Sequence, residues 1–257
     1  MTMDTFIREI TKKAGAAVLK RFGKDGALYL KTRNRLSVVT KADLLAEKII
    51  ISAIRKRYPD HGIIYEESAH HRPDAEYVWI IDPIDGTLNF ATGIPLFGTM
   101  VALAHRGKVI LSAIYLPVTN ELFFAKKGKG AYVNGKRIHC SRHSDWATST
   151  GVGPSGLRTR AIKFVGKLLT EVKAKRIVYC TYGCMAVDAA YIASGRRDWY
   201  VVVSGQTHDY APIVLLMQEA GCKVTNLRGE PWSLRDTEAV AANPRLHKQL
   251  LRLTKNV

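Results

Sequence analysis

The chain has 257 residues, of which 47% are apolar and 24% charged, a composition typical of a globular protein with one large domain or two of ordinary size. No apolar run is long enough to span a membrane, and the amphipathic N-terminus, MTMDTFIREITKKAGAAVLKRF, lacks the pattern of a signal peptide, so we expect a cytoplasmic protein. There are 39 Lys and Arg against 22 Asp and Glu, a formal net charge of +17.

This charge favours anionic partners: phosphorylated metabolites, nucleic acid or an acidic membrane surface. We retain a phosphorylated metabolite as the first candidate, nucleic acid as a less favoured second, and no membrane. The basic residues are spread in short clusters along the chain, and a solvated basic surface explains them more simply. The four cysteines form no CxxC pair and no zinc pattern, so we expect free thiols.

Apolar spacing predicts one helix over residues 4–22 and a second over residues 41–58, with Thr40 as its N-cap. The second helix is expected to turn four side chains inward, namely Leu44, Leu45, Ile51 and Ile54. Strand-like segments follow at residues 78–81, 98–104, 109–116 and 121–125. These segments predict an α+β half.

Two short segments fit hairpin turns between strands of this half. The first is Arg106-Gly107-Lys108, and the second is Asn134-Gly135, a strong type I′ signal. The predicted sheet is therefore antiparallel. We place the end of this half at about residue 140, which gives a first unit of residues 1–140 and a second of residues 141–257.

In the second unit helical and strand-like segments alternate, which favours an α/β arrangement. A loop is expected at residues 151–156. The predicted helices are residues 158–171, 184–194, 209–220 and 244–254. The predicted strands are residues 177–180, 200–203 and 239–242.

The segment YVWIIDPIDGTLNF, residues 77–90, places two aspartates at the end of a strand-like apolar run. Removing a carboxylate from water is costly, so something should compensate Asp82 and Asp85: a helix N-terminus, an arginine, solvent or a metal. We expect Pro83 to turn the chain at the strand's end, so that both carboxylates face one point beside the backbone N–H groups of a helix start at Thr87. Carboxylates suit Mg²⁺ and helix N–H groups suit phosphate, so the segment predicts a site for both.

Other acidic residues have simpler explanations when each is taken alone. Asp43 and Asp209 fit the first turns of helices, where a negative charge is favoured. The pair Glu66-Glu67 fits a solvated loop, and Asp85-Gly86 fits a turn.

Three motifs together are more specific. DPIDGT at residues 82–87, with EES at 66–68 upstream and HDYA at 208–211 downstream, resembles the inositol monophosphatase family of lithium-sensitive, magnesium-dependent phosphomonoesterases. The resemblance extends from VVTKAD at residues 38–43 to the C-terminal helix. It implies a layered αβαβα sandwich like that of fructose-1,6-bisphosphatase, two or three Mg²⁺ ions, inhibition by Li⁺ and a homodimer.

The resemblance also implies a role for each matching residue. The first Mg²⁺ would be held by Glu66, Asp82 and the backbone carbonyl of Ile84, and the second by Asp82, Asp85 and Asp209. The phosphate would lie on the backbone N–H groups of Gly86 and Thr87, and further substrate contacts would come from Gly183, Cys184 and Asp209. The catalytic residues would be Asp43, Thr87 and Glu66: the Thr87 hydroxyl, oriented by Asp43, would position the attacking water. Glu67 would lie behind the metal ligands and would not bind the metal itself.

Several positions depart from the family pattern. The family's WDxAG is His208-Asp209-Tyr210-Ala211-Pro212 here, and Pro212 is expected in the first turn of its helix. Tyr65 replaces a common glycine, and Cys184-Met185 follow Gly183 where small polar residues are common. Most important for specificity, Val202 stands where inositol-hydrolysing members tend to carry a glutamate that accepts hydrogen bonds from sugar hydroxyls.

The substrate therefore stays open at this stage. A sugar or polyol phosphate is expected, with inositol 1-phosphate as the default. The alternatives are fructose 1,6-bisphosphate, histidinol phosphate or a nucleotide 3′,5′-bisphosphate, whose second phosphate Arg196, Arg197 and the cluster at residues 173–176 would bind unless they are ordinary surface charges. Because some bacterial family members bind RNA or the transcription machinery, an additional role of that kind is the remaining alternative.

Overall fold

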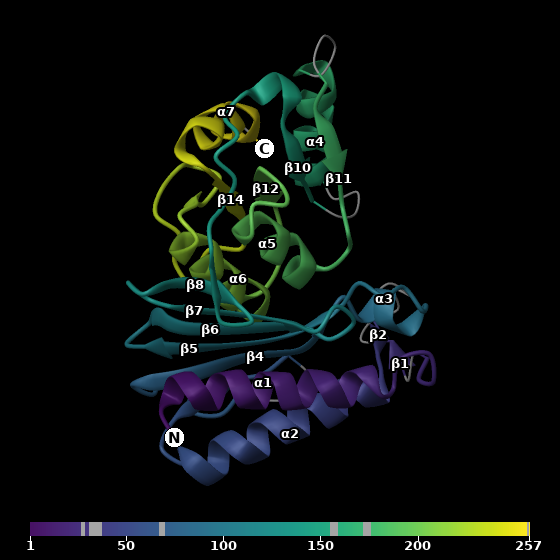
Figure 1. Cartoon of the computed structure of the whole chain (residues 1–257), viewed down its shortest axis with the longest axis vertical. Helices are drawn as coiled ribbons and strands as arrows, with labels where there is room; N and C mark the ends of the chain where they lie inside the picture. Colours follow the sequence, from purple (N-terminus) through teal and green to yellow (C-terminus); the bar gives the residue numbers. More distant parts are fainter. Residues whose placement is uncertain (27–28, 31–37, 67–69, 155–158, 172–175, 256) are drawn as a thin grey trace.

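The computed structural model describes the whole chain except residues 27–28, 31–37, 67–69, 155–158, 172–175 and 256. Glu67, for which a supporting role is predicted, lies outside the described residues, as do the basic residues Lys173 and Lys175. The described elements form five layers, helix, sheet, helix, sheet and helix (Figure 1). The predicted αβαβα sandwich is confirmed.

The layers can be followed from one end of the molecule to the other in Figure 1. Helices α1 (Met3–Leu19) and α2 (Lys41–Arg57) form the first outer layer, on a seven-stranded sheet. The middle helices are α5 (Met185–Ala193) and α6 (Thr207–Glu219), which separate this sheet from a five-stranded one. The second outer layer consists of α4 (Thr159–Glu171) and α7 (Pro244–Thr254). A two-stranded sheet of β1 (Tyr29–Leu30) and β2 (Val38–Val39) lies at the side.

The strands of the seven-stranded sheet lie side by side in chain order, and only the first pair is parallel. They are β3 (Gly62–Ile64), β4 (Tyr77–Asp85), β5 (Gly98–His105), β6 (Lys108–Leu116), β7 (Glu121–Lys126), β8 (Gly130–Val133) and β9 (Lys136–Ile138). The predicted hairpin turns are confirmed. Asn134 and Gly135 have φ angles of 47° and 80°, the left-handed pair that a type I′ turn requires.

Strand β4 is longer than the sequence predicts. It continues beyond Ile81 to Asp85, and its pairing with β5 shifts register between Asp82 and Asp85. Pro83 therefore lies in an irregular stretch of the strand and does not turn the chain at its end, which corrects the prediction. The sheet tolerates this proline because it lies in the register shift, where no β5 residue pairs with it, so its missing N–H costs no ladder hydrogen bond. Its carbonyl accepts a hydrogen bond of 2.9 Å from the Thr99 hydroxyl, and pairing resumes at Asp85 with Gly98.

Helix α2 begins after Thr40, as predicted, but its inward face is different. Leu44 and Leu45 are 40% and 38% exposed and Ile51 is half-buried, whereas Ile54 is buried as expected. The residues on the buried face are Ala42, Asp43, Ala46, Glu47, Ile50 and Ile54. Small alanines allow α2 to pack closely against α1, and the buried Asp43 fixes which side of the helix faces inward.

The five-stranded sheet has the order β11-β10-β12-β14-β13. Its strands are β10 (Thr150–Val152), β11 (Val178–Cys180), β12 (Trp199–Val202), β13 (Lys223–Thr225) and β14 (Ala239–Ala242). The first three are parallel to one another, and β13 and β14 pair antiparallel. Strands β11, β12 and β14 were predicted, but β10 and β13 were not, and the loop expected from residue 151 was wrong at Gly151 and Val152.

Gly151 is required where it stands. A Cβ there would come within 1.9 Å of the Trp199 ring, so only glycine allows this large buried side chain to pack across the strand pair. The predicted helices of this half correspond to α4, α5, α6 and α7 within a few residues.

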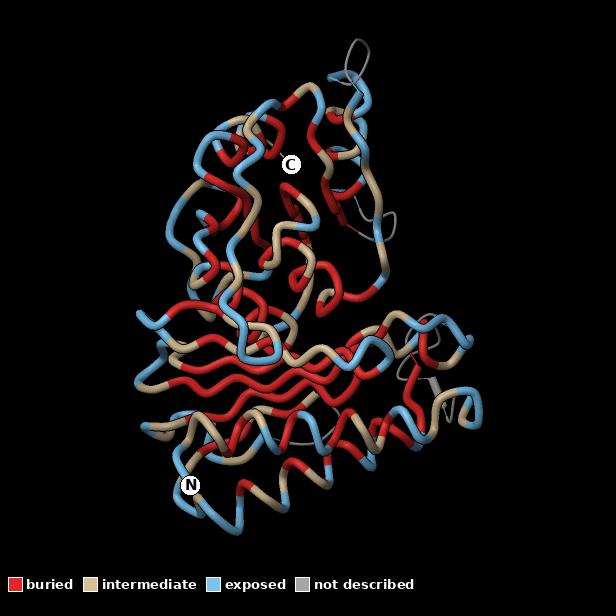
Figure 2. Tube along the Cα trace, viewed as in Figure 1, coloured by how far each residue is buried: buried red, intermediate tan, exposed pale blue. Residues whose placement is uncertain are grey.

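The seven-stranded sheet comes from before residue 139 and the five-stranded sheet from after residue 149, with the 3₁₀ turn η1 (Trp146–Thr148) between them. Apolar side chains from both sheets and from α5 and α6 form one continuous core, and the central strands β4, β5 and β6 of the larger sheet are buried along most of their length (Figure 2). Because the halves share this layer, their division into two units near residue 140 stays a prediction. All four cysteines are free thiols, and no helix among the described residues is long and apolar enough to cross a membrane.

Candidate functional site

Three carboxylates from distant parts of the chain meet where β4 ends. Asp82 and Asp85 come from β4 and Asp209 from the first turn of α6, and one oxygen atom of each lies within 4.8 Å of the others. Asp82 and Asp85 are buried, with exposed fractions of 1% and 9%. The cluster is thus completed by α6, a helix that begins more than 120 positions after the end of β4 in the chain.

The electrostatics of this cluster are unfavourable without a cation. Burial, together with the charges of Glu66, Asp85 and Asp209, raises the pKa of Asp82 well above its usual range. Burial also raises the pKa of Asp85 to about 7, although hydrogen bonds from Ala186 and Cys184 act in the opposite direction. Within the described part of the chain, Asp82 Oδ1 has no hydrogen-bond partner. A buried, unsatisfied carboxylate oxygen among like charges fits a divalent cation.

The start of α5 holds Asp85 in place. The backbone N–H of Ala186 donates to Asp85 Oδ2 over 2.5 Å, and the Cys184 thiol donates to the same oxygen over 2.8 Å. Cys184 is the N-cap of α5, so the positive end of that helix faces the carboxylate. The predicted substrate contact Cys184 therefore lies directly against a predicted metal ligand.

Asp209 and Glu66 approach the cluster from another side. Asp209 Oδ2 accepts a hydrogen bond of 2.6 Å from the Gln206 backbone N–H, which also caps α6. The buried His208 places its Nε2 3.6 Å from Asp209 Oδ1 and 3.9 Å from Glu66 Oε1. Pro212 lies in the second turn of α6 and not in the first as predicted, because the helix begins at Thr207. It removes the N–H that would bond to the His208 carbonyl.

Thr87 and Asp43 form a second feature of the site. The Thr87 hydroxyl lies 2.7 Å from the Ile84 carbonyl and 3.3 Å from Asp43 Oδ1. Asp43 is fully buried, and its other oxygen accepts hydrogen bonds from the Thr40 N–H and hydroxyl at 2.7 and 2.5 Å. Asp43 is thus both the capping residue that its sequence position suggests and a neighbour of Thr87.

The connection between β4 and α3 (Thr87–Ala91) requires glycine. Gly86 has a φ of 83°, and a Cβ there would lie 2.9 Å from the Leu96 carbonyl oxygen and 3.0 Å from the Cys184 Cβ. Asn89 completes the connection, because its amide donates to the carbonyls of Leu96 and Tyr182, each over 2.8 Å. It thereby ties α3 to the segment before Gly183. Asn89 was not predicted, because its only local signal is a polar residue on the buried side of a short helix.

The arginines proposed for a second phosphate have other partners. Arg196 binds both carboxylate oxygens of Glu121 and lies over the Tyr191 ring at 5.1 Å. Arg197 lies over the Tyr182 ring at 6.0 Å. Arg176 is exposed, and its neighbours at 172–175 lie outside the described residues. Arg196 therefore joins the two halves of the molecule, with β7 on one side and the end of α5 on the other.

The whole chain, residues 1–257, matches the family model described as the inositol monophosphatase family. The chain belongs to the inositol monophosphatase family. This confirms the resemblance on which the motifs were interpreted, and membership implies a phosphatase site.

Its relatives carry different names. Among curated proteins, "Nus factor SuhB" of Salmonella typhimurium is 35% identical over 255 residues, 97% of this chain and 94% of that protein. "Fructose-1,6-bisphosphatase/inositol-1-monophosphatase" of Thermotoga maritima is 30% identical over 252 residues, 98% and 95% of the two chains. Among solved structures, extragenic suppressor protein suhB of Bartonella henselae superposes with a TM-score of 0.91 at 30% identity, over 98% of each chain. The family is settled, and the substrate is left open.

Proposed function

We propose that the protein is a Mg²⁺-dependent phosphomonoesterase that acts on a small sugar or polyol phosphate, with inositol 1-phosphate as the first candidate. The observation that carries the proposal is the cluster of the buried Asp82 and Asp85 with the half-buried Asp209, together with the unsatisfied Asp82 Oδ1 among the described residues. A purely structural or binding role gives no reason to retain such an unfavourable group of charges.

The residues that would hold the metal are those of the sequence prediction. Glu66, Asp82 and the Ile84 carbonyl would take one ion, and Asp82, Asp85 and Asp209 a second. When bound, divalent cations neutralise phosphate charge and lower the pKa of a water molecule. The partners of Asp85 support this assignment, because Ala186 and Cys184 occupy its Oδ2 and so fix the direction of the carboxylate.

The chain's own contribution to water activation would be Thr87. A hydroxyl has one proton, so Thr87 can donate to only one acceptor at a time, and Ile84 is the nearer one in this structure. Donation to Asp43 instead would turn the lone pairs of the hydroxyl toward a water molecule. The backbone N–H groups of Gly86 and Thr87, at the start of α3, would bind the phosphate because the first N–H groups of a helix have no intrahelical acceptor.

The substrate is the least constrained part of the proposal. Val202 is buried in the apolar core between the sheets and offers no acceptor to a sugar hydroxyl. Fructose 1,6-bisphosphate, histidinol phosphate and a nucleotide 3′,5′-bisphosphate remain alternatives. The ion pair of Arg196 with Glu121 weakens the bisphosphate alternatives, because that arginine is already neutralised.

The test is a phosphate-release assay of the full chain over a panel of these phosphomonoesters, with and without Mg²⁺. We expect Mg²⁺-dependent release from at least one sugar or polyol phosphate, abolished by Asp85→Asn. Equal release by the folded Asp85→Asn protein would contradict the metal assignment. Inhibition by Li⁺ and a homodimer rest on the family resemblance, and a cytoplasmic location rests on the sequence pattern of the N-terminus; all three stay predictions.

A second candidate role is binding of RNA or the transcription machinery. It is supported by the 35% identity to a protein named Nus factor SuhB and by the net charge of +17. Its direct test is salt-dependent retention of the protein on RNA, since a phosphate-driven interaction weakens steeply with added salt.

A further inference from the structure

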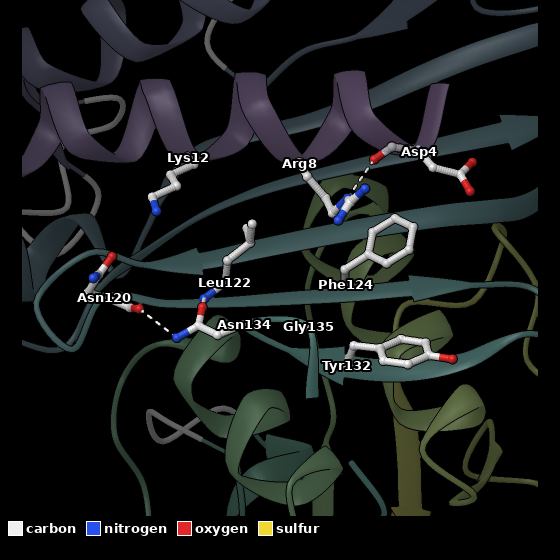
Figure 3. Close-up of a pocket in the computed structure, with 9 residues that line it drawn as sticks. All are labelled: Asp4, Arg8, Lys12, Asn120, Leu122, Phe124, Tyr132, Asn134 and Gly135. Atoms are coloured by element: carbon white, nitrogen blue, oxygen red, sulfur yellow. Dashed lines mark hydrogen bonds between the residues drawn. The ribbon is translucent and has the colours of Figure 1, made fainter. Parts of the chain in front are cut away.

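The outer face of strands β7, β8 and β9 lies beyond the helices that cover the rest of the sheet. Helix α2 packs on β4, and α1 packs on β4, β5, β6 and β7. Helix α6 covers the opposite face of β7 and β8. Among the described residues, neither α1 nor α2 has more than marginal contact with β8 or β9. The sheet face beside α1 that Figure 3 shows is therefore largely uncovered by these two helices, and Arg137 of β9 is exposed.

The strand register places aromatic and basic side chains in one row on this face. Phe124 pairs with Tyr132, and Tyr132 pairs with Arg137, so the three side chains lie on the same side of the sheet. Both rings are half-buried, and Leu122 is on the same side of β7 as Phe124. A cavity of about 610 Å³ lies over them, bounded by Asp4, Arg8 and Lys12 of α1 and by the turns at Asn120 and Asn134.

The charges that line this cavity are positive on balance, with Arg8 and Lys12 against Asp4. The Arg8 guanidinium lies over the Phe124 ring at 5.2 Å, and the exposed Lys12 lies one turn further along α1 (Figure 3). The one carboxylate lining the cavity, Asp4, pairs with Lys126 at 2.8 Å. Of the basic residues in β7 and β9, Lys126 and Arg137 lie on the same side of the sheet as Phe124 and Tyr132. The face therefore complements an anion.

Aromatic rings flanked by cations on an open sheet face match the chemistry of unpaired nucleotides. Bases stack on aromatic rings and on guanidinium planes, while Lys and Arg bind the phosphates. We propose that this face, the β7–β9 platform formed by Arg8, Lys12, Leu122, Phe124, Tyr132 and Arg137, binds single-stranded nucleic acid. A base stacks against Tyr132 beside Arg8, and the adjoining phosphates lie near Lys12 and Arg137.

Other anions fit less well. A duplex keeps its bases stacked on each other, so it cannot use the rings. A polyanion without bases would use only the cations. The platform locates the second candidate role on the chain and is independent of the metal site, since none of its residues belongs to the carboxylate cluster.

The experiment is fluorescence anisotropy of the full chain with end-labelled single strands of about ten nucleotides, which is within the range of sites of this kind. Its arms are RNA, single-stranded DNA of the same sequence, an abasic strand of the same length, and a duplex. We expect both single strands to bind more tightly than the abasic strand and the duplex. A preference for RNA over DNA would identify RNA as the natural ligand, and equal binding would identify unpaired nucleotides of either kind.

The decisive variants are Tyr132→Ala and Tyr132→Phe. Losing the ring should weaken binding about tenfold, whereas Tyr132→Phe keeps the ring and should bind like the wild type. Lys12→Ala should reduce the slope of log K for binding against log salt concentration by about one. The control is Lys163→Ala, at an exposed lysine of α4. Lys12 is at the surface, so this second variant tests the platform even if Tyr132→Ala fails to fold. All four variants should keep their phosphate-release activity.

The outcomes separate the platform from the role it serves. Single-strand binding that neither Tyr132→Ala nor Lys12→Ala weakens would keep the nucleic-acid role and refute the platform. Equal affinity for the abasic strand would refute base stacking and with it the proposal. Absence of binding at low salt by the wild type would overturn the platform and the second candidate role together, and leave the phosphatase proposal untouched.

Discussion

Asp82 and Asp198 are both almost completely buried, with exposed fractions of 1% and 8%, but the chain surrounds them differently. Asp198, which precedes β12, accepts hydrogen bonds from the Ser141 hydroxyl at 2.5 Å, the Thr150 N–H at 2.7 Å and the Thr150 hydroxyl at 3.0 Å. Asp82 lies among other carboxylates, and its Oδ1 has no hydrogen-bond partner in the described part of the chain. Donors around Asp198 mark a structural charge, whereas acceptors around Asp82 mark a place for a cation.

The largest effect is expected for Asp82→Asn, which tests whether the Asp82 charge serves a cation. We expect Mg²⁺-dependent phosphate release to fall at least about a hundredfold, because this change removes the negative charge of a proposed metal ligand. Without metal, the melting temperature should rise by about 3 °C, since a buried and repelled charge is gone. Calorimetry and the phosphate-release assay measure the two effects. The exposed Asp74→Asn is the control and should change neither. A variant that melts lower than the wild type without metal would mean that the Asp82 charge is already satisfied by the protein.

Asp198→Ala should lower stability and leave activity unchanged. Its three donors would lose their acceptor, so the free energy of unfolding should fall by about 4 kcal/mol, with activity per folded molecule retained. Urea unfolding measures the first quantity, and the assay at a temperature where the variant is folded measures the second. Asp198→Asn keeps one acceptor oxygen and should lose less. Loss of activity in a stably folded Asp198→Ala protein would show that this carboxylate also serves the site.

His247 in α7 is an intermediate case, because only one side of its ring is satisfied. Its Nε2 lies 2.9 Å from the Thr225 hydroxyl, and Nδ1 has no hydrogen-bond partner among the described residues. Burial, and secondarily Lys223, lowers the pKa of His247 to about 4. The unfolded chain takes up a proton near pH 6.5, so the protein should lose stability as the pH falls from about 6.5 to about 4, by about 3 kcal/mol.

Urea unfolding of wild type and His247→Gln across this pH range measures the effect. The variant should be less stable at pH 7 and show a shallower loss toward pH 4. The exposed His139→Gln should follow the wild-type pH dependence. Parallel curves for the wild type and His247→Gln would show that His247 is not buried in its neutral form.

The comparison also explains how far the sequence could predict the structure. Local sequence signals predicted the structure where contacts between neighbouring residues determine it: Asn134-Gly135 forms its hairpin, and Thr40 forms a capping box of α2 with Asp43. They failed to predict the structure where contacts with distant residues determine it. Pro83 is compatible with β4 because the pairing with β5 shifts register there and leaves no ladder bond for its missing N–H. Leu44 and Leu45 face solvent because the face of α2 that carries Asp43 turns toward Thr87.

The candidate site likewise combines features that local sequence predicts with features that depend on distant contacts. No local pattern links Asp209 to Asp82 and Asp85, and only the family resemblance placed them together, as the structure does. The family pattern did not indicate that the Cys184 thiol contacts Asp85 or that Asn89 bridges two carbonyls, because each depends on how the segment just before α5 approaches the end of β4 and α3. Residues that orient the ligands are therefore found only once the helices are in place.

The smallest expected effect is that of Thr87→Ala, and it separates the two roles of Asp43. Among the described residues, the Thr87 hydroxyl bonds to Ile84 and Asp43, whereas Asp43 also caps α2. Thr87→Ala should lower kcat about tenfold, with KM and the melting temperature nearly unchanged, because in the proposed mechanism the hydroxyl orients a water molecule and carries no charge. Thr87→Ser should restore kcat, since it keeps the hydroxyl. Asp43→Asn should lower both kcat and the melting temperature, since it weakens the cap by about 1 kcal/mol as well. Steady-state kinetics and calorimetry on the three variants give the comparison. A raised KM with unchanged kcat in Thr87→Ala would assign the hydroxyl to substrate binding, and Asp43 would then be a structural carboxylate of the same kind as Asp198.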